Sequence, residues 1–171
     1  MATVSAAPAA RADGEEPGRP RRYVACVRAA DRPGSITAMA EVVSSRGVSI
    51  QSFATGCTRD GTAMITMLFA TSERLERVIR RTLARLAIVE EVVVLPADDP
   101  RVLAVGVVHP APGTRFLPPP DVTVTWSGGT RPDEPLLVDG QYLHVRRVID
   151  AAIAADAVHA NVALLPPGQH S

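Results

Sequence analysis

The chain has 171 residues, a formal net charge of zero and a sequence pI of about 6.9. This length suits one domain or two small ones, and it is enough to bury a core without disulfide bonds. The neutral charge disfavours a nucleic-acid binding protein, and the absence of lysine excludes a Schiff-base lysine or a standard phosphate-binding loop.

The two cysteines, Cys26 and Cys57, form neither a CxxC pair nor any spacing typical of metal ligands. Both fall in expected strands or at strand ends, where a free thiol behaves as a small hydrophobic group, and a disulfide between neighbouring strands is the alternative. The N-terminus lacks the apolar core of a signal peptide, and no stretch reaches transmembrane length. We therefore expect a reducing, cytoplasmic location.

Residues 1–20 are mainly Ala, Pro, Gly and charged residues without a hydrophobic period, which predicts a disordered tail. The organised part begins at Arg22. A β-strand is expected over 23–28, followed by a turn over 31–34. Apolar residues then recur every three or four positions, which predicts a helix over 35–46 that ends at Gly47.

A second strand is expected from Val48 to Phe53, and the Asp60-Gly61 pair predicts a hairpin turn into a third strand over 62–70. Ser72 is a plausible N-cap for a second helix, and a fourth strand is expected over 89–95. The arginines on the outer face of this helix indicate a solvated surface. Nucleic-acid binding surfaces usually combine such arginines with aromatic residues, and this helix has none.

The order strand, helix, strand, strand, helix, strand over residues 22–97 predicts an α+β, ferredoxin-like unit. Its four-stranded antiparallel sheet would carry both helices on one face. The residues of the other face are apolar or small, so this face needs a cover. A second protomer and the C-terminal region are the two alternatives for that cover.

The segment from Asp31 to Ile36, together with Gly47-Val48-Ser49-Ile50 eleven residues later, resembles the signature of the ACT-domain family. The run from Gly47 to Leu95 is most similar to the regulatory subunit of acetolactate synthase, whereas the C-terminal half is not similar to it. The resemblance implies a regulatory module that binds a small amino acid between two ACT units. It places the partner's second strand, at Ser49 and Ile50, against the ligand.

The turn itself has the chemistry of a carboxylate site, because a helix that begins after Pro33-Gly34 presents unpaired amides and a positive dipole end. A ligand carboxylate is expected on the amides of Gly34, Ser35 and Ile36, and its ammonium group on Asp31. Arg32 completes the predicted ligand-binding set. The alternative is that Pro33-Gly34 only makes a tight turn.

Residues 98–171 are expected to form a smaller β/α region, either a degenerate second ACT-like unit or a packing extension. The expected elements are strands over 101–108, 122–126, 136–138 and 162–165, a helix over 141–156, and a turn at Asp139-Gly140. The four histidines are scattered without a metal-ligand spacing, so no metal or other cofactor is expected.

We therefore interpret the chain as an amino-acid sensing regulatory protein rather than an enzyme. It is expected to form a homodimer through the sheet or the ligand-loop edge and to control an amino-acid or secondary-metabolism enzyme, without nucleic acid or membrane partners. One alternative is a small enzyme whose site, in the C-terminal region, involves Trp126, Asp139 or His144. The other is a structural dimerisation module without a ligand.

Overall fold

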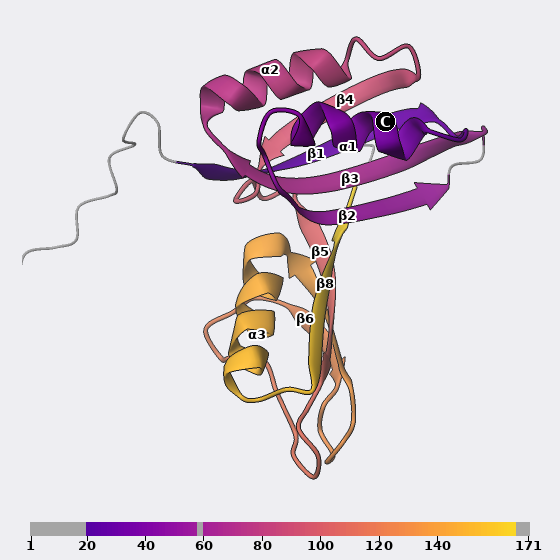
Figure 1. The fold of residues 1–171 in the computed structure, drawn as a ribbon. Coiled ribbons are helices and arrows are strands. Elements are labelled where there is room, and N and C mark those ends of the chain that lie inside the picture. The colour runs from indigo at the N-terminus through magenta and orange to yellow at the C-terminus, as the bar shows by residue number, and fades with distance from the viewer. Residues whose placement is uncertain (1–19, 58–59, 167–171) are drawn as a thin grey trace, which may run out of the picture.

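The structure, a computed structural model, describes residues 20–57 and 60–166. The expected N-terminal tail, apart from Pro20, lies outside the described residues, as does half of the expected hairpin turn over 58–61. The described chain forms two antiparallel sheets of four strands each, and three helices pack on them (Figure 1). None of these helices is long and apolar enough to cross a bilayer.

The first unit has the expected βαββαβ order, with the sheet order β2-β3-β1-β4 and both helices on one face (Figure 1). The α+β, ferredoxin-like prediction is therefore confirmed. Its elements are β1 (Arg21–Ala30), α1 (Ser35–Ser44), β2 (Ile50–Cys57), β3 (Thr62–Thr71), α2 (Glu73–Leu83) and β4 (Val89–Pro96).

Helix α2 shows how the local sequence sets this arrangement. Ser72 caps the helix, since its hydroxyl accepts a hydrogen bond from the amide of Leu75 at 3.4 Å. Ile79 and Leu83 are fully buried against the sheet. The arginines of the opposite face stay exposed, as expected for a solvated helix surface.

The second unit has the strand order β6-β7-β5-β8, and α3 covers one face of this sheet. Numbered within each unit, the two sheets share the order second, third, first, fourth. A loop over residues 110–124 stands where the first unit has its first helix. The elements are β5 (Leu103–His109), β6 (Thr125–Gly128), β7 (Leu136–Gln141), α3 (Tyr142–Ala154) and β8 (His159–Leu165).

Two local predictions in this unit are wrong. Asp139 and Gly140 do not form a turn but lie within β7, paired with Val105 and Ala104 of the neighbouring β5. The expected strand over 122–126 begins only at Thr125. Val122 and Val124 pack against the core from a loop instead, and the amide of Thr123 donates to the His144 side chain at 3.2 Å rather than to a strand.

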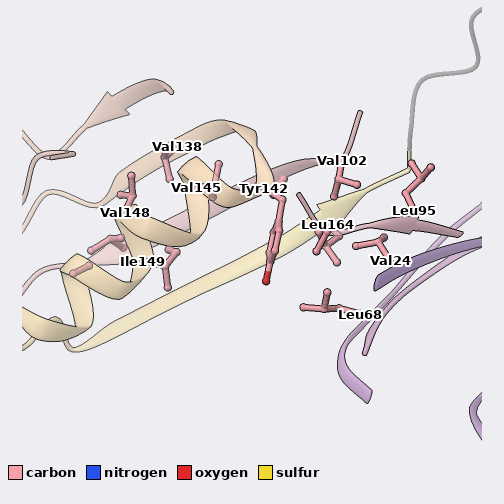
Figure 2. Close-up of a cluster of buried hydrophobic side chains, with 14 of the residues drawn as sticks. Val24, Leu68, Leu95, Val102, Val138, Tyr142, Val145, Val148, Ile149 and Leu164 are labelled. Atoms are coloured by element: carbon pink, nitrogen blue, oxygen red, sulfur yellow. The ribbon is translucent and has the colours of Figure 1, made fainter. Parts of the chain in front are cut away.

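Part of the face of the first sheet that carries no helix packs against the C-terminal region of the same chain, which is one of the two predicted alternatives for its cover. Val24, Leu68 and Leu95 from the first sheet share one buried cluster with Tyr142 and Leu164 of the second unit (Figure 2). At the rim, the Arg21 guanidinium donates to both carboxylate oxygens of Asp98 at 2.8 Å. The two units therefore share a continuous core.

Gly128 is expected to be intolerant of a side chain. Its φ is +79°, and a Cβ there would lie 2.1 Å from the carbonyl oxygen of Pro135. We expect Gly128→Ala to lower the free energy of unfolding by roughly 3 kcal/mol, measured by urea denaturation. Gly113→Ala is the matched control, because Gly113 has a similar φ of +73° but open space around it, so it should cost only about 1 kcal/mol. Equal costs for both variants would contradict the close approach.

Cys26 is expected to be chemically inert in the fold. Burial raises the pKa of its thiol to about 11, while a hydrogen bond with Thr66 acts in the opposite direction. Iodoacetamide at pH 8 should therefore leave Cys26 unmodified in the native chain and modify it after unfolding, as read by peptide mass spectrometry. Modification at equal rates in both states would contradict this.

The same thiol makes stability depend on alkaline pH. The folded pKa lies above the ordinary value of 9.0, so the contribution is complete below pH 9 and is lost as pH rises towards 11. The expected loss is about 2 kcal/mol in the free energy of unfolding. Cys26→Ala should lose less stability across this interval than the unmodified chain does.

Candidate functional site

The turn between β1 and α1 is held by hydrogen bonds to two neighbouring segments and by one bond across the turn itself. The amide of Ala30 donates to the carbonyl of Ile88 at 2.8 Å, and the amide of Asp31 donates to the carbonyl of Gly61 at 3.1 Å. The buried Ser35 hydroxyl donates to the carbonyl of Ala30 at 2.8 Å. These contacts hold the backbone of the turn in place without a ligand.

Helix α1 begins without a capping side chain. Its N-cap is Gly34, whose φ of +88° lies in the left-handed region that glycine adopts without strain, and its first turn holds no acidic residue. Within the described residues, the amides of Gly34, Ile36 and Thr37 make no hydrogen bond, while the Ser35 amide donates to the carbonyl of Arg32 at 3.2 Å. Free amides at a positive helix end are a seat for an anion.

A cavity of about 430 Å³ is lined by Gly34 and Ile36, two of the residues with free amides. Its floor is apolar, because Ala63 and the fully buried Ile65 of β3 face it. Its rim is charged, since Asp31 and Arg32 are exposed and neither side chain has an ion pair among the described residues. The lining residues are Asp31, Arg32, Pro33, Gly34, Ser35, Ile36, Thr55, Gly56, Ala63 and Ile65.

The five turn residues of the predicted ligand-binding set, Asp31, Arg32, Gly34, Ser35 and Ile36, all line this one cavity. The other two, Ser49 and Ile50, lie at the opposite end of β2, where Ile50 pairs with Phe69 of β3. Their assignment to the partner's side of the ligand stays a prediction.

Four lining residues were not singled out from the sequence: Thr55, Gly56, Ala63 and Ile65. The β2-β3 hairpin brings them to the turn, since Thr55 pairs with Ile65 across the two strands. Counting equal numbers of residues outward from the Asp60-Gly61 pair would have placed Thr55 opposite Thr66, one residue out of register, so the sequence alone does not identify this pair. The strand ends near that turn therefore complete the cavity.

The residues proposed for an enzyme site in the C-terminal region do not come together. Trp126 pairs with Val138, so its side chain projects from the sheet face that α3 covers. Asp139, the next residue along β7, projects from the opposite face. His144 is engaged by the amide of Thr123 at its Nδ1 atom. This arrangement does not favour a shared catalytic centre.

Comparison of the fold with solved structures identifies the architecture. The small subunit of acetolactate synthase from Thermotoga maritima superposes with a TM-score of 0.61 at 13% identity, covering 85% of this chain and 96% of that chain. The first unit has an ACT-like fold. The ACT-like fold carries the candidate cavity at the turn that the family signature predicted.

The similarity extends beyond the ACT-like unit, because 85% coverage exceeds the share that residues 22–96 make up. The expectation that the C-terminal half lacks this likeness is therefore corrected at the level of the fold. The regulatory subunit of aspartate kinase from Thermus thermophilus also matches, at 11% identity and a TM-score of 0.43, over 82% of this chain and 99% of that chain. No protein-family model and no curated protein matches the sequence.

Proposed function

We propose that this chain is a regulatory protein that senses a small amino acid in the cavity between the Asp31–Ile36 turn and the β2-β3 hairpin. The observation that carries the proposal is the combination of unpaired helix amides, an unpaired carboxylate and an apolar floor around one cavity. An α-amino acid has a carboxylate, an ammonium group and a side chain in the matching arrangement.

In the proposed complex, the ligand carboxylate accepts hydrogen bonds from the amides of Gly34 and Ile36 at the start of α1. The Asp31 carboxylate accepts from the ligand ammonium. The ligand side chain lies towards Ala63 and Ile65, and Gly56 leaves open space beside it. Ser35 acts indirectly by fixing the turn, since both its hydroxyl and its amide are already engaged.

The cavity opens near β2, which is the outer strand of the first sheet. We propose that a second copy pairs along this edge and contributes Ser49 and Ile50, which makes the ligand part of the dimer contact. A signal then passes through β3, whose Ile65 faces the cavity while Leu68 packs against the second unit. The proposed target is a cytoplasmic enzyme of amino-acid or secondary metabolism.

A thermal-shift screen of the purified chain against the twenty amino acids tests this function. A ligand that binds only the folded state raises the melting temperature by mass action. Gly34→Asp should abolish the shift, because it places a carboxylate where the ligand carboxylate would bind. Gly47→Asp is the matched control, since Gly47 has a φ of +72° at the other end of α1 and does not line the cavity.

One amino acid that stabilises both the parent chain and Gly47→Asp, but not Gly34→Asp, is the expected result. No shift with any amino acid would contradict the sensor and would favour a structural dimerisation module. Equal shifts in both glycine variants would place the ligand elsewhere on the chain.

A further inference from the structure

A second cavity, of about 530 Å³, lies where the two units meet. Three strands of the first sheet line it, through Arg22 of β1, Gln51 of β2 and Ala70 of β3. The second unit lines it through Leu143, which is exposed at the start of α3. The cavity therefore has walls from both units and is separate from the amino-acid cavity at the Asp31–Ile36 turn.

The two cavities lie on opposite faces of the first sheet. Arg22 and Ala70 are paired across β1 and β3, two positions along their strands from Val24 and Leu68. Side chains two positions apart on a strand share a face, and Val24 and Leu68 face the second unit. Ile65, which lines the amino-acid cavity, belongs instead to the core under the helices. A ligand in the second cavity would therefore not compete directly with the amino acid.

The second cavity carries one uncompensated positive charge. The Arg21 guanidinium donates to both carboxylate oxygens of Asp98 at 2.8 Å, so these two lining residues neutralise each other. Arg22 is exposed, and its guanidinium makes no hydrogen bond or ion pair with any residue that the structure describes. The Arg22 side chain is thus available to an anion.

A β-bulge brings a second hydrogen-bond donor to the same cavity. Ile50 pairs with Phe69 and Ser52 pairs with Leu68, so Gln51 is the extra residue of β2. Bulges redirect side chains out of the regular alternation of a strand and are frequent beside functional sites. The exposed Gln51 side chain has no hydrogen bond to another described residue, and its amide group can donate.

We propose that this cavity binds a small organic anion, as a second effector site distinct from the amino-acid site. The Arg22 guanidinium donates two parallel hydrogen bonds to the carboxylate or phosphate group of the anion, and the Gln51 amide donates another. The apolar part of the anion lies against Leu143. Because Leu143 follows Tyr142, whose ring lies in the core shared by the two units, the bound anion contacts the junction between them.

An NMR titration of the labelled full chain with butanoate, inorganic phosphate and the neutral analogue butanamide tests the site. At least one of the two anions should shift the Arg22 Nε–H and Gln51 side-chain amide signals in a saturable way, whereas butanamide should not. A response to butanoate alone assigns a carboxylate ligand, and a response to phosphate alone assigns a phosphoryl group. Signals that stay unmoved with both anions, or that move equally with butanamide, would overturn the proposal.

Arg22→Gln should raise the dissociation constant of the anion at least tenfold, followed through the Gln51 amide signal. Arg74→Gln is the matched control, since it removes the same charge from an exposed arginine of α2 that does not line the cavity, and it should leave the affinity unchanged. Equal weakening in both variants would show general charge attraction and overturn the site. Asp31→Asn should leave anion binding unchanged, so the outcome here is independent of the amino-acid site.

Discussion

Replacing Tyr142 with alanine is expected to lower the free energy of unfolding by about 3–5 kcal/mol, the range for removing a large buried aromatic ring. Tyr142 is fully buried and extends from the start of α3 into the core shared by the two units, near Leu68 and Leu164 (Figure 2). Chemical denaturation followed by circular dichroism measures the effect.

Tyr142→Phe is the control that separates the ring from the hydroxyl. The hydroxyl is buried and has no partner with hydrogen-bonding geometry among the described residues, although the Arg146 guanidinium lies close by. Removing it should therefore change stability by less than about 1 kcal/mol. A large loss in Tyr142→Phe, or a small loss in Tyr142→Ala, would contradict a shared core centred on this ring.

Replacing Asp31 with asparagine is expected to weaken binding of the amino-acid ligand by roughly 10- to 100-fold, the loss of a hydrogen bond to a charged group. The Asp31 carboxylate is exposed and has no ion pair or hydrogen bond among the described residues. The melting temperature of the unliganded chain should therefore stay the same. Isothermal titration calorimetry with the amino acid identified in the screen measures the dissociation constant.

Glu41→Gln provides the comparison for this variant. Glu41 is an exposed carboxylate on the same helix, α1, but it does not line the cavity. The dissociation constant of the Glu41→Gln variant for the amino acid should match that of the parent chain. Equal weakening in both variants would indicate a long-range charge effect rather than a contact between Asp31 and the ligand ammonium.

The first unit follows from the sequence because its local signals agree with one another. Ser72 caps α2 as predicted, and the apolar period of that helix buries Ile79 and Leu83. The turn between β2 and β3 is also predicted from the sequence, since Gly61 has a φ of +74°, which favours glycine. Consistency between propensity, turns and burial leaves few alternatives.

The second unit is less predictable because its strands depend on partners far along the chain. Asp139 and Gly140 have the composition of a turn, yet β5 supplies ladder partners that keep both residues in β7. The alternation at Val122 and Val124 reflects burial from a loop, which periodicity cannot distinguish from a strand. Tertiary pairing overrides local preference at these positions.

Part of the candidate site can likewise be predicted from the local sequence, and part depends on strand pairing. The turn from Asp31 to Ile36 is local, so the sequence alone predicts its free amides and its carboxylate. The walls at Thr55 and Ile65 come from the β2-β3 hairpin and depend on register. The shared core between the units required three-dimensional contacts, since nothing in the sequence around Tyr142 identifies Leu68 as its neighbour.

The most direct test of the account is an amide-proton NMR titration of the labelled full chain with the amino acid that stabilises it. The account predicts that the largest shift changes fall on Gly34, Ile36 and Thr37, whose amides are free at the start of α1, and that they saturate with the calorimetric affinity. Shift changes concentrated in the second unit, with the α1 amides unmoved, would contradict the proposed amino-acid site.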